Sequence, residues 1–372
     1  MEKREILIIG AGPAGLAASV EAARTGAQVL LVDENDTPGG QLFKQIHKFF
    51  GSAQHRAGTR GIHIGKQLLE QTKEVKVELW LNTTAVGAAG DRQVALVRKK
   101  EDETAETIVV EAEKILVCCG GAENAVNFEG WTLPGVMGAG AAQTMVNVRR
   151  VLPGQRILMV GSGNVGLIVS YQLMQAGADV VGIVEAAPKI GGYCVHAGKI
   201  RRAGVPVYLS HTVLHADAKE GSEEVASAVI VQIDEHFQPV EGTEKKIECD
   251  TICIATGLRP QIKLSTLLGV KNGFIPELGG WMPLHDEHME TSVKGIFVAG
   301  DTAGVEEAST AMDEGSLAGV SMAFDLGYMT EEAAAEARKE ITERLKALRL
   351  GPFGERRQNA KDRIIAEGKQ HE

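Results

Sequence analysis

The sequence lacks any pair of cysteines at the spacing of a redox dithiol. It contains five cysteines in 372 residues, and no two of them form a Cys-x-x-Cys or a Cys-x4-Cys pair. Four lie in apolar, strand-like runs, and the fifth follows a Gly-Gly-Tyr sequence: Cys118, Cys119, Cys249, Cys253 and Cys194. Thiols in such runs are typical of reduced core cysteines in a cytosolic protein. The spacing therefore excludes an internal dithiol–disulfide centre.

Several other features are also missing. The N-terminus enters an apolar run at residues 6–9 without the longer apolar region of a signal peptide. No apolar run approaches the roughly 20 residues that a membrane-spanning helix needs. The net charge of −10 argues against an extended nucleic-acid surface. No Gly-x-Ser-x-Gly elbow and no credible pair of catalytic carboxylates occurs. We expect a cytoplasmic protein with no catalytic side chain that the sequence alone identifies.

Two glycine fingerprints dominate what is present. Residues 10–15 (GAGPAG) follow the apolar run 6–9, and residues 161–166 (GSGNVG) follow the apolar run 157–160. In a strand–turn–helix unit the first glycine allows a tight turn, the second lets backbone approach a pyrophosphate, and the third lets helix pack on strand. The helix N-terminus then offers free N–H groups to the phosphates. Two such units predict two dinucleotide sites.

Each fingerprint has an acidic residue at the end of the next predicted strand. Asp33 lies 23 residues after Gly10, and Glu185 lies 24 residues after Gly161. At this spacing a carboxylate is expected to bind ribose hydroxyls. The Glu185 carboxylate would repel the 2′-phosphate of NADP, so the second site is expected to prefer NAD. A third apolar run, residues 295–299, ends at a Gly300-Asp301 pair.

The order of predicted elements repeats along the chain. A strand, a helix over about 14–25 and a strand over 29–32 are followed by β-type runs at 75–81, 94–99 and 107–110, which predict a small antiparallel meander returning through 114–119. A second series has a strand at 157–160, a helix at about 164–176, a strand at 180–184 and β-rich runs at 225–233 and 246–253. A helix over about 334–346 should break at 351–354, and the segment beyond it should fray or dock on a partner.

This order predicts an α/β fold with two Rossmann-like dinucleotide-binding domains, one inserted in the other, and a helical C-terminal tail. The predicted boundaries are 1–123 with 261–330 for the FAD-type domain, 124–260 for the NAD-type domain, and 331–372 for the tail.

Four motifs resemble the pyridine nucleotide-disulfide oxidoreductase family, especially its thioredoxin-reductase-like branch. They are residues 10–15, 38–42 (PGGQL), 255–260 (ATGLRP) and 295–301 (GIFVAGD). The resemblance implies FAD in the first site and NAD or another adenine nucleotide in the second. It also implies that Asp301 contacts the flavin ribitol, and that a helix at about 307–323 directs its positive N-terminus at the isoalloxazine pyrimidine.

Residues 130–136 (GWTLPGV) and 140–143 (GAAQ) carry a narrower resemblance. They are similar to the dinucleotide-binding subunits of amine and amino-acid dehydrogenase or oxidase complexes, such as those of sarcosine oxidase (alpha), opine oxidase (A), hydrogen cyanide synthase (B) and dye-linked proline dehydrogenase (alpha). That resemblance implies a partner flavoprotein that oxidises an amine or amino acid, and FMN at a subunit interface. Because residues 331–372 contain no cysteine, a [2Fe–2S] centre would belong to a separate small protein.

The expected function is a flavin-dependent oxidoreductase subunit that relays electrons from such a partner. Two alternatives stay open, namely a stand-alone NADH-dependent reductase of a ferredoxin- or rubredoxin-type acceptor, and a non-redox nucleotide-binding assembly subunit.

The motifs and the resemblance together predict twenty cofactor-binding residues. They are Gly10, Gly12, Pro13, Ala14, Gly15, Asp33, Glu34, Gly40, Gln41, Val86, Gly120, Gly161, Gly163, Asn164, Val165, Gly166, Glu185, Gly257, Gly300 and Asp301. No metal site is predicted. The stretch with His47, His55 and His63 lacks a carboxylate or cysteine at ligand spacing, and its lysines and arginines indicate a basic loop near a cofactor or a solvated surface.

Overall fold

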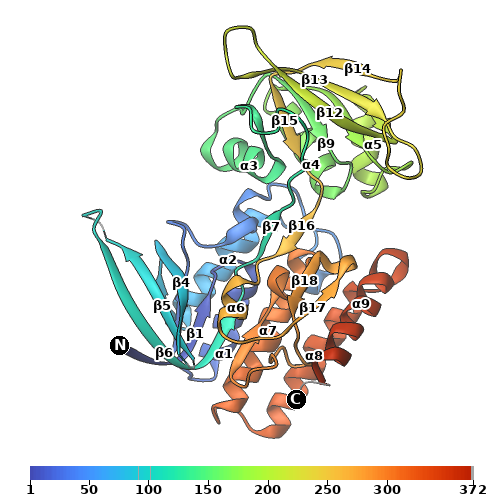
Figure 1. The fold of residues 1–372 in the computed structure, drawn as a ribbon. Coiled ribbons are helices and arrows are strands. Elements are labelled where there is room, and N and C mark those ends of the chain that lie inside the picture. The colour runs from blue at the N-terminus through green and yellow to red at the C-terminus, as the bar shows by residue number, and fades with distance from the viewer. Residues whose placement is uncertain (91, 101, 370–372) are drawn as a thin grey trace. The chain divides into compact units, whose positions relative to one another are not determined.

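The computed structural model describes residues 1–90, 92–100 and 102–369. They form two compact units, residues 1–122 with 259–372 and residues 123–258, which are described separately below (Figure 1). The strands at the two connections, β7 (Gly121–Glu123) and β16 (Leu258–Pro260), pair with each other. Within the part of the chain described, no helix is long and apolar enough to cross a membrane.

The first unit is built on a parallel sheet. Its strands run in the order β3-β2-β1-β6, and β19 pairs with the other side of β6. The bounds are β1 (Glu2–Ile9), β2 (Val29–Val32), β3 (Glu78–Trp80), β6 (Ala105–Val117) and β19 (Ile296–Val298). All four residues of β2 and the last four of β1 are buried. Continuous burial of this kind is expected for a parallel strand covered on both faces.

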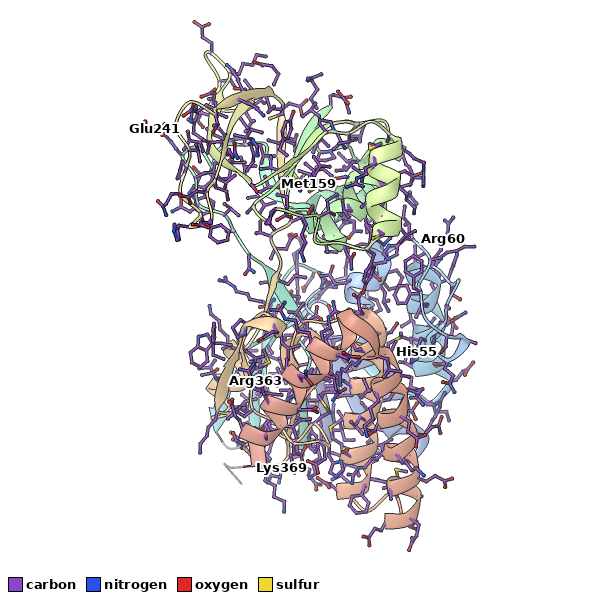
Figure 2. The ribbon with its side chains drawn as sticks, turned by 90° about the vertical axis from the view of Figure 1, so that its right-hand side faces the viewer. His55, Arg60, Met159, Glu241, Arg363 and Lys369 are labelled. Carbon is purple, nitrogen blue, oxygen red and sulfur yellow. The ribbon has the colours of Figure 1, made fainter. Side chains whose placement is uncertain are left out.

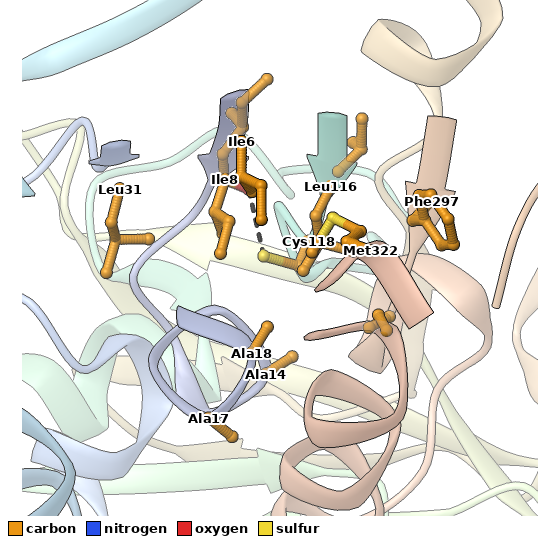
Figure 3. Close-up of a cluster of buried hydrophobic side chains, with 14 of the residues drawn as sticks. Ile6, Ile8, Ala14, Ala17, Ala18, Leu31, Leu116, Cys118, Phe297 and Met322 are labelled. Atoms are coloured by element: carbon orange, nitrogen blue, oxygen red, sulfur yellow. Dashed lines mark hydrogen bonds between the residues drawn. The ribbon is translucent and has the colours of Figure 1, made fainter. Parts of the chain in front are cut away.

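Helices α1 (Pro13–Arg24) and α7 (Ala308–Asp325) pack closely beside this sheet. A Cβ atom at Gly315 or Gly319 would collide with the carbonyl oxygen of Ala14 or Ala18, respectively, so two glycines of α7 allow the close approach. Figure 3 shows Ala14 and Ala18 in the same apolar cluster as Ile8, Leu116 and Phe297. The longer helices α2 (Gly61–Glu74), α8 (Glu331–Leu348) and α9 (Gly351–Lys369) also belong to this unit.

An antiparallel meander extends the same sheet, but its first strand differs from the prediction. The meander consists of β4 (Thr83–Gly90), β5 (Gln93–Lys99) and the first half of β6. The predicted run 75–81 is wrong as a meander strand, because its centre is β3, which pairs in parallel with β2. The predicted run 107–110 and the first four residues of the predicted run 114–119 belong to one long strand, β6, which ends at Val117. Its first half pairs with β5 and its second half with β1.

The second unit repeats the plan with its own parallel sheet, in the order β11-β10-β9-β15-β8. The bounds are β8 (Val136–Gly138), β9 (Arg156–Val160), β10 (Asp179–Glu185), β11 (Val207–Leu209), β15 (Thr251–Ile254), α3 (Ala139–Thr144), the π-helical turn η3 (Met145–Arg149), α4 (Asn164–Gln175) and α5 (Cys194–Arg202). An antiparallel sheet joins β12 (His211–Ala218), β13 (Val225–Gln232) and β14 (Lys245–Glu248). The predicted run 246–253 is therefore two strands in two sheets, separated at Cys249 and Asp250.

The remaining elements are short, and the chain is helical from Gly351 to Lys369. The short elements are η1 (Gly40–Lys44), η2 (Ala53–His55), α6 (Lys263–Leu267), β17 (Asn272–Ile275), η4 (Pro276–Leu278), β18 (Gly280–Pro283) and η5 (Gly300–Ala303). The predicted helix 334–346 is confirmed within α8. A new helix, α9, begins at Gly351 and continues to Lys369, so the prediction of a frayed end is wrong for the described residues. A small apolar cluster of Ile275, Leu278, Met282, Leu284, Ala360 and Ile364 fixes α9 to η4 and its neighbouring strands.

Candidate dinucleotide sites

The first glycine loop lies between β1 and α1, and two of its glycines are required by backbone contacts. Gly10 has φ +109°, and a Cβ there would collide with the carbonyl oxygen of Cys118. A Cβ at Gly15 would collide with the carbonyl oxygen of Gly10. Gly12 is different. Its φ of −75° suits any residue, and a Cβ there would meet no atom within 4 Å. The space over Gly12 is open, as a cradle for a pyrophosphate requires.

Asp33, at the end of β2, holds this loop in place. Its Oδ2 accepts a hydrogen bond of 2.7 Å from the Ala11 N–H, and its Oδ1 accepts bonds of 2.9 Å from both the backbone and the side-chain nitrogen of Asn35. The carboxylate is buried, while neighbouring Glu34 is exposed. The geometry therefore assigns Asp33 a loop-holding contact. A contact with ribose stays a prediction for both residues.

Two segments far apart in sequence lie against the first loop. The Gly39 N–H donates to the Ala11 carbonyl over 2.7 Å, and a Cβ on Gly40 would lie 3.0 Å from the Gly12 Cα. A Cβ on Gly300 would lie 3.1 Å from the Ala14 Cβ. The structure thus brings the 10–15 loop, the 39–41 turn and Gly300 together.

Gly120 joins this group through Thr302, whose hydroxyl accepts a 3.0 Å bond from the Gly120 N–H. Two other predicted residues are placed less tightly. Gln41 is exposed at the start of η1, and Val86 on β4 is 55% exposed. No contact links Val86 to the glycine loop among those recorded for the described residues.

Asp301 lies in the turn η5, directly before α7. Burial raises the pKa of its carboxyl from 3.8 to about 6. A hydrogen bond from the Glu306 backbone and the charge of Lys361 oppose that rise in pKa, while the charges of Glu314 and Glu306 add to it. An acid that is partly protonated just below neutral pH is expected where a carboxylate lies in a desolvated site.

The second glycine loop, between β9 and α4, reproduces the first. Gly161 has φ +105°, and a Cβ there would collide with the Ala255 carbonyl oxygen. A Cβ on Gly166 would collide with the Gly161 carbonyl oxygen, while a Cβ on Gly163 would meet nothing within 4 Å. Both loops therefore have two glycines at which a Cβ would collide with backbone, on either side of one glycine at which it would meet no atom.

Glu185 holds the second loop as Asp33 holds the first. Its Oε2 accepts bonds from the backbone N–H and the hydroxyl of Ser162, at 2.8 and 2.6 Å, and its Oε1 accepts a 2.8 Å bond from the Ala187 N–H. Gly257, with φ +101°, follows β15, and its carbonyl accepts a 3.0 Å bond from the Asn124 N–H.

The sequence reasoning missed a turn at Gly191 and Gly192. The Gly192 N–H donates to the Ser162 carbonyl over 2.9 Å, and the Tyr193 N–H donates to Asn164 Oδ1 over 2.8 Å. This turn is the counterpart of Gly39–Gly40 in the first unit. Its signal was present in the spacing, because Gly191 lies 30 residues after Gly161 and Gly39 lies 29 residues after Gly10.

Both loops present helix N-termini suited to an anion. No side chain caps α1 or α4, so their first-turn N–H groups are not bonded by a capping side chain. Ala14 is buried at the start of α1, whereas Val165 at the start of α4 is 40% exposed. Uncapped N–H groups and the helix dipole favour a phosphate at each place. The residues of both loops fit a nucleotide pyrophosphate, and so fit FAD or NAD.

The cysteines are not arranged for redox chemistry. All five lie within the described residues and are free. Burial raises the pKa of Cys118 well above its ordinary value and raises those of Cys119, Cys249 and Cys253 to about 12. The Cys118 thiol donates to the Ile9 carbonyl inside the core (Figure 3). Only Cys194 is exposed.

The histidine-rich stretch places one of its histidines, His55, in the core. Across residues 1–90, 92–100 and 102–369, no group of three or more His, Cys, Asp or Glu side chains is arranged to hold a metal ion. His55 is buried, with Nε2 3.7 Å from Asp313 Oδ2, beside a cavity of about 280 Å³ lined from α1, α2, α7 and α8 (Figure 2). The predicted proximity of this loop to a cofactor stays a prediction.

Comparison with known proteins identifies relatives that are described as subunits. Hydrogen cyanide synthase subunit HcnB of Pseudomonas aeruginosa is 28% identical over 370 residues, which cover 92% of this chain and 76% of that protein. The A subunit of opine oxidase from Agrobacterium tumefaciens is 27% identical, covering 90% of this chain and 68% of that protein. The alpha subunit of sarcosine oxidase from Rhizobium meliloti is 29% identical, covering 87% of this chain but only 31% of that protein.

Solved structures confirm the predicted fold. Thioredoxin reductase of T. acidophilum superposes with a TM-score of 0.70 at 19% identity, covering 88% of this chain and 99% of that one. L-proline dehydrogenase of P. horikoshii superposes with a TM-score of 0.66 at 21% identity, covering 92% of this chain and 59% of that one. The fold is therefore thioredoxin-reductase-like, with an added C-terminal helical region.

The family model for pyridine nucleotide-disulphide oxidoreductases matches residues 4–315, a span that contains both glycine loops and Asp301. This family implies binding of FAD and NAD(P), and together with the relatives it supports a flavin oxidoreductase. The match confirms the family predicted from the motifs: the chain belongs to the pyridine nucleotide-disulphide oxidoreductases.

Proposed function

We propose that this chain is the nucleotide-binding flavoprotein subunit of an amine- or amino-acid-oxidising dehydrogenase complex. It would receive electrons from a catalytic partner protein and pass them toward an acceptor. The observation that carries the proposal is the coexistence of two complete nucleotide cradles with thiols that form no redox pair. The chain is equipped to hold redox nucleotides, and it has no dithiol through which a disulfide reductase would pass electrons.

The relatives supply the amine-oxidising partner in this proposal. Those named above are described as subunits of hydrogen cyanide synthase, opine oxidase and sarcosine oxidase. A substrate pocket for the amine would then lie on the partner chain. FMN would lie at the interface with that partner, and a [2Fe–2S] centre would lie on a further small protein.

We assign FAD to the first site and NAD or another adenine nucleotide to the second. Bound flavin would supply the one- and two-electron chemistry, and the protein would supply binding and charge. Gly12 and Gly163 would admit the pyrophosphates, and Asp301 would accept a hydrogen bond from a ribitol hydroxyl. The Glu185 carboxylate would disfavour a 2′-phosphate. The domain limits 1–123 with 261–330, 124–260 and 331–372 go with this assignment.

One observation favours a second candidate. The Gly161–Gly166 cradle is as complete as the first, and a complete NAD site suits a stand-alone NADH-dependent reductase of an iron–sulfur or rubredoxin-type acceptor. A third candidate, a subunit whose nucleotides only support assembly, needs no electron transfer.

Isolation of the tagged chain from the cells that produce it tests the proposal. We expect a second flavoprotein to co-purify, and the isolated complex to oxidise at least one member of a panel of sarcosine, L-proline and opines with a dye acceptor. The same preparation, heated to release nucleotides, should yield FAD. A chain that purifies alone and lacks amine-dependent dye reduction would contradict the proposal, and NADH-dependent dye reduction by it would support the reductase.

A further inference from the structure

The C-terminal helices carry two cations into the core beneath the Gly300–Asp301 turn. Arg349 follows α8 and Lys361 lies on α9, and their side chains are 8% and 1% exposed. Lys361 is among the largest fully buried side chains of the described residues. The family model ends at residue 315, so neither cation belongs to the family pattern. Burial of two charged side chains is costly unless they are paired.

Both cations form ion pairs with two carboxylates that lie next to the Gly300–Asp301 turn. Arg349 makes a two-pronged contact with Glu306, at 2.6 and 3.0 Å, and contacts Glu314 Oε1 at 2.8 Å. Lys361 Nζ lies 2.7 Å from the same Glu314 oxygen and 3.8 Å from Glu306. The side chains of Glu306 and Glu314 are each only 3% exposed. The four side chains form a buried cluster of two cations and two anions.

Two hydrogen bonds tie this cluster to the turn. Glu314 Oε2 accepts a bond of 3.1 Å from the Gly300 N–H, and Lys361 Nζ donates a bond of 2.9 Å to the Ala303 carbonyl. The cluster therefore forms a hydrogen bond with each end of η5, and Asp301 lies between those ends.

Asp301 is the third carboxylate of the region, so its ionisation depends on the balance of the surrounding charges. The charged groups that act on it are Glu306 before α7, Glu314 on α7 and Lys361 on α9. Arg349, after α8, contacts both glutamates, and His285 lies beside the two cations. Burial, and then the charge of Lys361, lower the pKa of His285 to about 3, so that ring is neutral. Two cations therefore lie among three carboxylates, and the loss of one cation makes the net charge of this group more negative.

We propose that Lys361, supported by Arg349, is a positioning residue for the first nucleotide site: it fixes the turn around Asp301 and keeps the Asp301 carboxylate ionised for a ribitol hydroxyl. This inference rests on the proposed FAD site. It makes α9 part of the cofactor site, with Lys361 acting through Glu314, the Ala303 carbonyl and its charge. A charged acceptor binds a hydroxyl more strongly than a neutral carboxylic acid does.

The test is the pH dependence of FAD binding to the full-length apoprotein, measured by titration with FAD. In the wild type, FAD affinity should fall as the pH falls through the titration of Asp301. Lys361→Met removes a cation, so it should raise the midpoint of that fall by about one pH unit. FAD binding should then be about fivefold weaker at the wild-type midpoint and about tenfold weaker at pH values well below it. Glu314→Gln removes an anion and should lower the midpoint. Lys361→Met combined with Glu314→Gln should return it toward the wild-type value.

Lys369→Met is the matched control, because Lys369 lies on the same helix (Figure 2) and its ion pair with Glu287 is half exposed. It should leave the midpoint unchanged. If Lys361→Met does not fold, the lowered pH midpoint of FAD binding in Glu314→Gln tests the inference instead. The inference would be overturned if Lys361→Met lowered the FAD affinity equally at every pH, or if Glu314→Gln did not shift the pH midpoint of FAD binding. Either result would mean that the cluster only stabilises the fold. A wild-type protein that binds no FAD at any pH would overturn the proposed function and the inference with it.

Discussion

Gly12→Val should abolish nucleotide retention at the first site while the protein stays folded. The structure separates the two effects, because a Cβ at Gly12 meets no protein atom within 4 Å and the φ of −75° suits valine. The expected cost to stability is that of a poorer helix N-cap, about 1 kcal/mol. The valine side chain occupies the space into which a pyrophosphate must enter.

The loss in affinity follows from the bonds that this side chain blocks. A hydrogen bond from a backbone N–H to a charged phosphate contributes about 1.5–3 kcal/mol. Loss of one such bond therefore weakens binding about 10- to 150-fold, and displacement of the whole pyrophosphate weakens it further. The assay is the amount and identity of nucleotide released from purified protein by heat, together with the melting temperature of the same sample.

Two glycines of the same pattern serve as controls. Gly163→Val makes the same change in the second unit and should deplete only the second nucleotide. Gly15→Ala places a Cβ against the Gly10 carbonyl oxygen and should destabilise the fold itself, by about 1–3 kcal/mol or more. Normal nucleotide content in a folded Gly12→Val protein would refute the assignment of the first site.

Three further predictions concern charge and thiols. The pKa of Asp301 is about 6 in the folded protein against 3.8 ordinarily, so the folded state binds one more proton than the unfolded state between these pH values, and the protein loses stability as the pH rises through them. Asp301→Asn should therefore raise the melting temperature of the apoprotein at pH 7 while it weakens FAD binding. A lower melting temperature would contradict this. Glu185→Ala should destabilise the second unit by about 1–3 kcal/mol, since three hydrogen-bond donors lose their acceptor. It should also reduce the preference for NAD over NADP in parallel titrations. An unchanged ratio of the two affinities would argue against a role of Glu185 in nucleotide choice. Mild alkylation of the folded protein should modify Cys194 alone, as measured by mass spectrometry. Cys194→Ser or Cys118→Ala should leave turnover of the assembled complex within a few-fold of the wild-type value. A hundredfold loss of turnover, with fold and flavin intact, would show that the chain uses disulfide chemistry.

The parts of the fold that the sequence predicted are those set by local geometry. A tight turn that needs φ near +100° admits little but glycine, so Gly10 and Gly161 mark both strand–helix junctions reliably. The apolar runs before them are buried on both faces and have no competing periodicity. The exposed thiol and the buried thiols also follow from local composition.

The parts that the sequence did not predict depend on distant partners. Strand β4 (TTAVGAAG) contains three alanines and two glycines, whose β-propensity is low, and it pairs with β5 along its length. No glycine or proline separates β14 from β15, so their division between two sheets depends on tertiary pairing. The contacts of Arg349 and Lys361 with Glu306 and Glu314 join residues 35 to 55 positions apart, and no motif announces them.

The central claim, that this chain relays electrons from a partner, is tested most directly by anaerobic stopped-flow absorbance of its bound flavin. The flavin should stay oxidised when the isolated chain is mixed with NADH, and should bleach when the partner protein is added together with its amine substrate. Rapid bleaching by NADH without the partner would contradict the relay and identify a stand-alone reductase. Flavin that responds to neither mixture would contradict any redox role for this chain.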